Sequence, residues 1–437
     1  MSLDYYELIE RYRLTQPSSL KDILKPSSSV TEDGFFSALD RSNSGAKSIF
    51  LNISIPDLSI NSSLGSITPE AHTKRYFEAL CLEIQQLATY LDRDREVSFI
   101  KLYGAGANSL SADFLEDLVE LIHTEFTIAP DATVGIICTP SFLSLRRIDD
   151  LRRIGFNFIT IDQQDFRTEI LDAIEADYKA LPISNQVQHI RKRGRIKLNI
   201  QLSYGMPIQT ADSFIESVKE VAQLAPETIT LTPFCYSSTA ESTKQRIDFY
   251  GLPSEEECIA MLYETFCYLT QSHYKCINPH LYIKEEQSSS IGYFSNMTIS
   301  SILQYPLNIT GYQIYGIGVG SESLFSDLYS VNESSWKVYA DKIGTGAPSA
   351  AVAAKLTQPN RICLDVATTL AFYETVDLSD IETRYTIPME MIKNIVEQGF
   401  TDYNKLFTNG ILSDHQSSIR VSSPMYAQVL LQQIRIM

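Results

Sequence analysis

The sequence has 437 residues, of which 44% are hydrophobic and 20% charged, so it can form two or three domains with a large core. Its formal net charge of −17 argues against proteins that bind duplex nucleic acid or an anionic membrane surface, because both need a basic face. There is no run of about 18 apolar residues and no basic segment before an apolar start, so we expect neither a transmembrane helix nor a secretory signal.

Seven cysteines are scattered along the chain, and no CxxC pair or HExxH pattern occurs. An odd number of widely spaced cysteines is typical of reduced thiols rather than of a disulfide framework, so we expect a cytoplasmic protein. The same spacing argues against a zinc site, and we predict no metal site.

Strands and helices alternate through the first half of the chain. The expected strands cover residues 48–55, 97–103, 133–138, 157–162, 196–203 and 228–233. A helix that opens at Pro69 and helices at 111–125, 144–154, up to about 192, and 211–224 separate them. This alternation predicts parallel βαβ units in a barrel or an open sheet.

Beyond residue 250 the pattern changes. Ser254 and Glu257 predict a capping box that opens a helix to about residue 272. The serine-rich segment 284–300 is expected to be a loop, and the chain after about 330 is expected to be mostly helical. Segment 405–422 predicts a hairpin, with Asn409-Gly410 as its turn signal.

Several segments, in order, resemble the oxygen-independent coproporphyrinogen III oxidase family. Segment 155–166 (GFNFITIDQQDF) resembles the family's strand that ends in Gln-Asp-Phe, and 203–210 (SYGMPIQT) resembles its YGLPxQT turn. Segment 252–274 resembles the helix after the barrel, and 315–321 (YGIGVGS) resembles an LGxGVxS turn. The resemblance implies an α/β fold, a (β/α)6 partial TIM barrel of the radical-SAM type, with a C-terminal helical, winged-helix-like domain.

The resemblance also predicts the domain boundaries. We expect an N-terminal arm at 1–47, the partial barrel at 48–250, an extension that completes the barrel at 251–330, and the C-terminal domain at 331–437.

The resemblance implies a 4Fe–4S cluster and S-adenosylmethionine (SAM). The family holds the cluster with three cysteines of a CxxxCxxC motif after the first strand. In this sequence those positions fall on Leu58, Ser62 and Gly65, and no cysteine precedes Cys81. Because these side chains cannot replace thiolates, we expect no cofactor in this protein.

The positions that line the SAM pocket in the family have changed as well. Two glycines of the turn beside the methionyl group and one glutamine are kept. An isoleucine, an alanine and a glutamine replace the glutamate, arginine and aspartate that the resemblance implies. The residual positions are Gly104, Gly106, Ile137, Gln164, Ala176 and Gln201.

Other patterns allow two interpretations each. Gly104 and Gly106 indicate either a phosphate or nucleotide cradle or a strand-to-helix turn kept from ancestry. Cys138 and Cys235 are either a pair of metal ligands or packing residues. The basic run 191–195 is either a solvated helix end or a contact for porphyrin carboxylates.

His280 is the histidine closest to the family's His-Phe pair on the substrate side. It is therefore the candidate tetrapyrrole contact, or the axial ligand of a haem, although a single histidine is more often structural.

These observations lead to one main hypothesis and three alternatives. The main hypothesis is a family protein that has lost the cluster and SAM chemistry, a pseudoenzyme or repurposed scaffold with a tetrapyrrole or protein partner. The alternatives are a haem- or porphyrin-binding or trafficking protein, and a coproporphyrinogen oxidase. A last alternative is an enzyme with new chemistry near Asp162, Gln164 and Cys138, which form no pair of convincing spacing.

Overall fold

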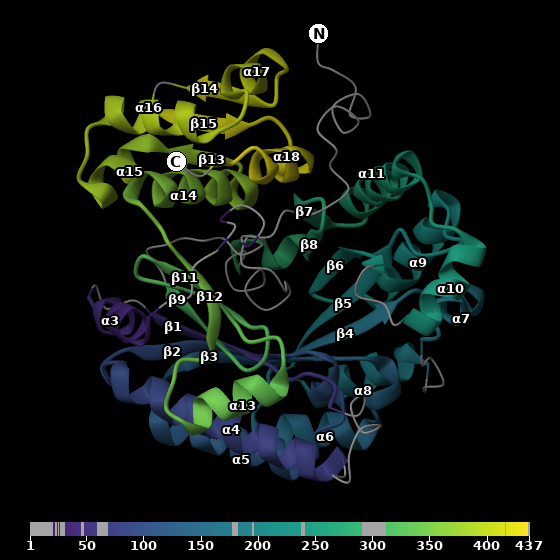
Figure 1. Cartoon of the computed structure of the whole chain (residues 1–437). Helices are drawn as coiled ribbons and strands as arrows, with labels where there is room; N and C mark the ends of the chain where they lie inside the picture. Colours follow the sequence, from purple (N-terminus) through teal and green to yellow (C-terminus); the bar gives the residue numbers. More distant parts are fainter. Residues whose placement is uncertain are drawn as a thin grey trace.

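The computed structural model describes residues 21, 24, 26, 31–44, 48–58, 69–176, 182–194, 196–236, 241–290, 312–415 and 417–435. A sheet of 12 strands forms the centre, in the order β12-β11-β10-β9-β1-β2-β3-β4-β5-β6-β8-β7. A second sheet of three strands, β13-β15-β14, belongs to a smaller C-terminal domain (Figure 1).

Six parallel neighbours make the middle of the large sheet. They are β1 (Ser48–Ser54), β2 (Glu96–Tyr103), β3 (Thr127–Cys138), β4 (Phe158–Gln164), β5 (Lys197–Tyr204) and β6 (Thr228–Pro233). The expected strands are confirmed, and with them the predicted partial barrel of βα units. The sequence signal for the third strand covered only the second half of β3.

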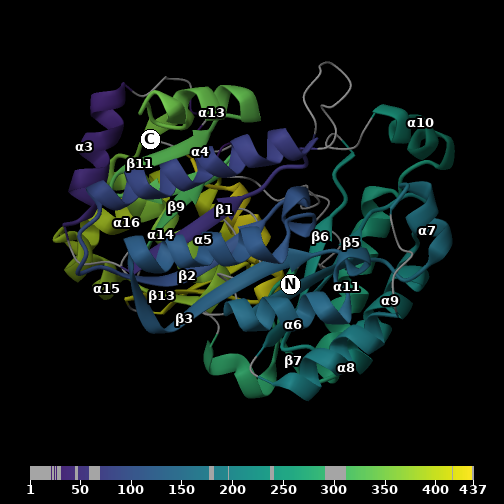
Figure 2. The same ribbon diagram turned by 90° about the horizontal axis from the view of Figure 1, so that it is seen from below.

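Helices follow the strands and cover the outer face of the sheet (Figure 2). They are α4 (Pro69–Tyr90), α5 (Ala112–Glu125), α6 (Leu145–Ile154), α7 (Thr168–Ala173), α8 (Ile183–Arg193) and α9 (Ala211–Leu224). Local chemistry sets several of their starts, because the side chains of Ser111, Ser144 and Thr210 each accept a backbone N–H three residues later.

In the described part of the chain, six further strands extend the sheet at its two edges, and all of their pairings except that of β9 with β1 are antiparallel. After α10 (Glu241–Tyr250) and α11 (Glu255–Gln271), β7 (Tyr274–Asn278) and β8 (Leu281–Lys284) join the edge at β6. At the other edge β9 (Tyr312–Ile317) runs parallel to β1, and β10 (Glu322–Phe325), β11 (Leu328–Asn332) and β12 (Ala350–Lys355) follow. The expected domain boundary at 331 therefore falls within β11, and the sheet continues to residue 355.

Two helices pack beside these edge strands. α3 (Glu32–Ser42) lies close to β10, and α13 (Trp336–Gly344) packs along α4. The expected loop at 284–300 begins as a short 3-10 helix, Glu285–Ser290, and its remainder lies outside the described residues.

The C-terminal domain contains helices around the small sheet, as expected. Its elements are α14 (Gln358–Tyr373), β13 (Thr375–Asp377), α15 (Leu378–Tyr385), α16 (Met389–Gly399), α17 (Tyr403–Thr408), β14 (Leu412–His415), β15 (Ser418–Val421) and α18 (Ala427–Gln432). The predicted hairpin is β14–β15. Its predicted turn is wrong, because Asn409 caps the end of α17 and Gly410 precedes β14.

Two cores hold the molecule together, one on each face of the large sheet. Ile49, Leu51 and Ile53 of β1 pack toward the outer helices, whereas Phe50 packs with the core of the C-terminal domain. This alternation shows which strand residues face inward. Within the described residues no helix has both the length and the apolar character that a bilayer crossing requires.

Candidate functional site

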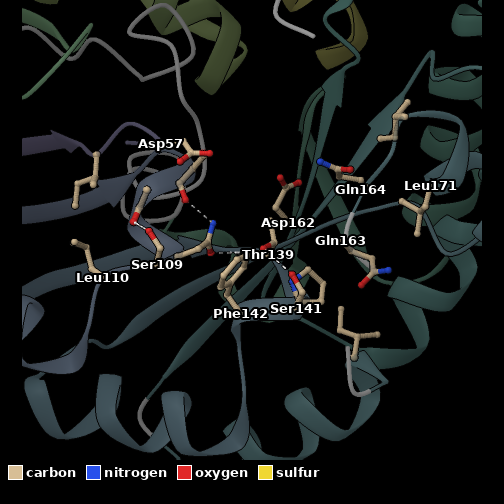
Figure 3. A pocket seen from close by; sticks show the side chains of 18 of the residues that line it. Asp57, Ser109, Leu110, Thr139, Ser141, Phe142, Asp162, Gln163, Gln164 and Leu171 are labelled. Carbon is tan, nitrogen blue, oxygen red and sulfur yellow. Dashed lines mark hydrogen bonds between the residues drawn. The ribbon is translucent and has the colours of Figure 1, made fainter. Parts of the chain in front are cut away.

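A cavity of about 1510 Å³ opens at the carboxyl ends of β1 to β4. Polar side chains from the ends of β3 and β4 and from the segments after β1 and β2 line it (Figure 3). Ligand sites of α/β proteins lie at this end of parallel strands, because the connecting loops converge there.

The turn after β2 shapes one wall of the cavity. Gly104 has φ of 98°, which only glycine adopts without strain, and the short helix η2 (Ala105–Asn108) follows it. A Cβ on Gly106 would lie 2.0 Å from the carbonyl oxygen of Pro56, so glycine allows this turn to pack on the segment after β1. The Gly106 N–H donates to the Ile55 carbonyl and the Ala107 N–H to the Gly104 carbonyl, which favours the inherited turn over a phosphate cradle.

Asn108 connects this turn to the end of β3. Its Oδ1 accepts the Thr139 N–H at 3.0 Å, and its Nδ2 donates to the Ala105 carbonyl at 3.3 Å. The hydroxyls of Thr139 and Ser141 lie 3.4 Å apart beside it. This wall of the cavity therefore presents hydroxyl and amide groups, with the ring of Phe142 beside them (Figure 3).

Asp162 is the carboxylate at the floor of the cavity. It lies beside Gln201 in the β4–β5 register, and the Gln201 Nε2 donates to its Oδ1 at 3.0 Å. The Gln164 side chain also donates to it, and burial raises the pKa of Asp162 to about 6. Gln164 has φ of 63°, a backbone conformation that costs free energy for a residue other than glycine and that is concentrated at functional sites.

The cavity is acidic. Among the described residues that line it, the charged side chains are the carboxylates of Asp57, Asp162, Glu175 and Glu220 and the amine of Lys74. All of these except Asp162 are exposed. Burial thus distinguishes the Asp162 carboxylate from the carboxylates at the rim.

The structure brings some of the predicted site residues together. Four of them line the cavity: Leu58, Gly106, Gln164 and Ala176. Gln201 does not line it but donates a hydrogen bond to Asp162, which does. Gly104 sits in the turn, and Ile137 of β3 is not part of the lining. Ser62 and Gly65 lie outside the described residues.

Sequence patterns gave no signal for three polar members of the site. Asp57, Thr139 and Ser141 lie on segments that follow different strands. Their only common signal is a position just after a strand end, which many loop residues share.

The cysteines do not converge on the cavity. Cys138 packs among the outer helices, and burial raises the pKa of its thiol to about 12. Burial and the nearby Asp117 and Glu78 raise the pKa of Cys81 to about 11. Within the described residues there is no group of three or more side chains suited to a metal ion, and of the two cysteines considered as a pair, Cys138 is buried whereas Cys235 is exposed.

His280 is buried away from the cavity. It lies just before β8, and its Nε2 is 3.0 Å from the Tyr204 hydroxyl while the two rings stack. Burial lowers the pKa of His280 to about 4, so the ring is neutral at physiological pH. These contacts are those of a structural histidine, and His280 is not among the residues that line the cavity.

The basic run pairs with carboxylates on the outer surface. Arg191 binds Glu227 at 2.5 Å, and Arg193 binds Asp149 at 3.2 Å. Both belong to the last turn of α8, as the solvated-helix-end interpretation predicts, and neither lines the cavity. Arg195 is outside the described residues.

Lys101 carries a buried amine. It lies on the concave face of the sheet near the carboxyl end of β2, just before the turn that follows this strand. Its neighbours Ile100 and Leu102 point to the outer helices, and it lies between Asn52 and Gly135 in the strand register. It is 1% exposed, its amine is 5.9 Å from the centre of the Tyr103 ring, and burial lowers its pKa from 10.5 to about 7.

We expect Lys101→Met to raise the free energy of unfolding at pH 7 by about 2 kcal/mol or more. Burial lowers the pKa of Lys101 from 10.5 to about 7, and each unit of that decrease corresponds to about 1.4 kcal/mol of stability that the buried amine costs at pH 7. Between pH 7 and 10.5 the unfolded chain carries a proton that the folded chain lacks, so the stability of the unaltered protein rises with pH there. Urea denaturation at pH 7 and 10 should show a gain that shrinks at pH 10. A gain that does not change with pH would contradict this account of Lys101.

Comparison with known proteins extends this description. No family model matches the chain. The oxygen-independent coproporphyrinogen III oxidase of Escherichia coli K12 is 26% identical over 385 residues, which are 87% of this chain and 84% of that protein. The oxidase of Pseudomonas aeruginosa is 24% identical over 351 residues, which are 80% of this chain and 75% of that protein.

The fold agrees over the whole length. The E. coli coproporphyrinogen III oxidase, described as a radical SAM enzyme, superposes with a TM-score of 0.78 over 99% of this chain and 98% of that structure, at 22% identity. This chain is similar to the oxygen-independent coproporphyrinogen III oxidases in sequence and in fold. The resemblance of the sequence segments to this family is thereby confirmed, together with the fold that it implied.

The comparisons contradict the expectation that the protein uses no cofactor. The matched structure is described as a radical SAM enzyme, and this family implies a 4Fe–4S cluster and SAM. That expectation is therefore withdrawn. Whether the residues of this chain could hold the cluster is a different question from what the family uses. The sequence from residue 48 to 80 contains no cysteine, and Leu58 occupies the first ligand position. Three thiolates are not available there, so the residues after β1 do not fit a cluster held in the family's way.

Proposed function

We propose that this protein binds coproporphyrinogen III, the compound for which its relatives are named, in the cavity at the carboxyl ends of β1 to β4. The observation that supports this most is the correspondence over the whole chain with the E. coli oxidase, at a TM-score of 0.78 over 99% of its residues. A shared barrel alone would support only a common scaffold, whereas this match includes the C-terminal domain.

The size of the cavity is consistent with a large ligand. Its volume of about 1510 Å³ exceeds the roughly 300–1,000 Å³ of common small-molecule sites. Apolar side chains such as Leu110, Phe114 and Phe166 line it together with the polar groups of its floor. Such a lining suits the apolar macrocycle of this ligand, whereas its four propionates would be repelled by the exposed carboxylates of the rim.

The relatives favour one activity within this proposal, the oxidation of coproporphyrinogen III. Each of the curated relatives described above carries the name of this oxidase. In the family, the cluster and SAM supply the oxidising chemistry when they are bound. In this chain, the described residues would bind and orient the substrate, with Asp162 and Gln164 at the floor.

One observation favours a second candidate, a tetrapyrrole-binding protein without this chemistry. The segment after β1 holds none of the three cysteines that the family uses. Binding and turnover must therefore be measured separately.

The test is an anaerobic titration with coproporphyrinogen III, followed by an assay for decarboxylated product after incubation with iron, sulfide, SAM and a reductant. We expect saturable binding with one equivalent. Ala105→Trp should abolish it, because Ala105 lines the cavity and a large ring would fill it, whereas Val338→Trp on α13, where Val338 is 45% exposed, should not.

The outcomes separate the candidates. Binding with product formation supports the oxidase activity, and binding without product supports the tetrapyrrole-binding protein. Absence of binding, or equal loss in the two tryptophan variants, overturns the proposal.

A further inference from the structure

Asp162 is placed where a ligand in the cavity would meet it. The preceding residue of β4, Ile161, packs with the outer helices, so Asp162 points to the concave face and into the cavity (Figure 3). The other carboxylates of the lining, on Asp57, Glu175 and Glu220, are exposed to solvent. Asp162 is therefore the acidic group that a seated ligand would remove most fully from water.

Neighbouring amides hold this carboxylate in place without neutralising it. Gln201 donates to Oδ1 at 3.0 Å, and the Gln164 side chain donates as well. Within the described residues no cation contributes to its environment; only burial and these two amides do. An ionised carboxylate has about four lone-pair sites, so Asp162 keeps acceptor capacity that a ligand with several donors would use.

A porphyrinogen is such a ligand. Its four pyrrole N–H groups belong to a flexible, non-planar macrocycle and can turn toward one acceptor. The oxidised porphyrin is flat, has two inner N–H groups and keeps them in the plane of the ring. Both forms carry the same four propionates, so repulsion from the acidic rim of the cavity affects them alike. A carboxylate at the floor would therefore distinguish the two oxidation states and not their side chains.

We propose that Asp162 is a specificity-determining residue that accepts the pyrrole N–H groups of a reduced tetrapyrrole and so selects porphyrinogen over porphyrin. This inference rests on the proposed function, because it requires a coproporphyrin-type ligand in this cavity. Gln201 and Gln164 act as positioning residues that hold the carboxylate. Hydrogen bonds to a charged acceptor in a closed site are strong, so the preference is expected to be about tenfold or more.

The experiment compares anaerobic binding of coproporphyrinogen III with binding of coproporphyrin III. The unaltered protein is expected to bind the reduced form about tenfold more tightly. Asp162→Asn keeps the size of the side chain and should remove this preference while leaving the affinity for coproporphyrin nearly unchanged. Asp57→Asn, at the exposed rim of the same cavity, should keep the preference. Gln201→Leu should reduce it, because one donor to Asp162 is lost.

Several outcomes would overturn the inference. Equal affinity for the two forms in the unaltered protein would do so without any variant, and so would a preference that survives in Asp162→Asn. In both cases coproporphyrinogen still binds and the proposed function stands. If neither tetrapyrrole binds, the proposed function itself has failed, and the inference fails with it.

Discussion

Replacing Gly106 by alanine should lower the free energy of unfolding by about 3 kcal/mol and weaken ligand binding in the cavity. An added Cβ would lie 2.0 Å from the carbonyl oxygen and 2.8 Å from the carbonyl carbon of Pro56. These are backbone atoms, so the clash cannot be relieved by rotating a side chain. The segment after β1 must move, and it carries Asp57 and Leu58 at the edge of the cavity.

The matched control is Gly344→Ala at the end of α13, where the added Cβ would meet no heavy atom within 4 Å apart from its chain neighbours and the backbone of its own helix. Alanine is preferred to glycine in a helix by about 0.5–1 kcal/mol, so this variant should be as stable as the unaltered protein or slightly more stable. Urea denaturation and coproporphyrinogen titration of both variants provide the measurement. Equal stability of the two variants would contradict this prediction, because it would show that the segment after β1 can move away from the added Cβ without a cost in free energy.

The parts of the fold that sequence predicted are those set by local chemistry. Ser144 caps α6 through its side chain, and Gly155 ends that helix at φ of 116°. Ser254 likewise caps α11, although the predicted capping box is only half formed. The Glu257 carboxylate instead accepts the Ala211 N–H at the start of α9, 2.6 Å away. A distant backbone donor thus took the place of the local one.

The parts that sequence missed depend on pairing between distant segments. β9 pairs with β1 although more than 250 residues separate them, and β10 to β12 extend that edge. These strands are four to six residues long, too short for a clear periodic pattern. Their register follows from packing of the whole sheet, so the boundary expected at 331 fell inside one of them.

The candidate site shows the same division. Sequence reasoning identified Gln164 and the glycine turn, because both lie in segments that resemble the family. It predicted that Gln201 replaces the family's aspartate, so that this carboxylate of the pocket is lost. The β4–β5 register places Asp162 next to Gln201, at 3.0 Å, so a carboxylate is present on the neighbouring strand. Reading the strands one at a time could not reveal this pair.

Replacing Glu83 by alanine should cost about 3–5 kcal/mol of unfolding free energy, because it removes the acceptor from a buried network. Glu83 of α4 accepts the Gly318 N–H at 2.7 Å and the Tyr339 hydroxyl at 2.5 Å, and the Asn332 amide donates to it at 3.2 Å. Burial raises the pKa of Glu83 to about 6. Alanine would remove the acceptor of the Gly318 N–H, just after β9, and of the Tyr339 hydroxyl on α13, whereas the Asn332 amide keeps the Gly316 and Gly318 carbonyls and the Ser321 hydroxyl as acceptors.

Gln86→Ala is the control on the same helix, because its amide donates to the Gly346 carbonyl at 2.6 Å on the exposed side. A surface hydrogen bond of this kind contributes about 1 kcal/mol or less. Thermal and urea denaturation should therefore separate the two variants clearly. Comparable losses in the two variants would mean that water satisfies the donors around position 83, and that Glu83 does not join α4 to the turn after β9. A large loss confined to Glu83→Ala would show that this buried carboxylate fixes the added edge strands against the barrel.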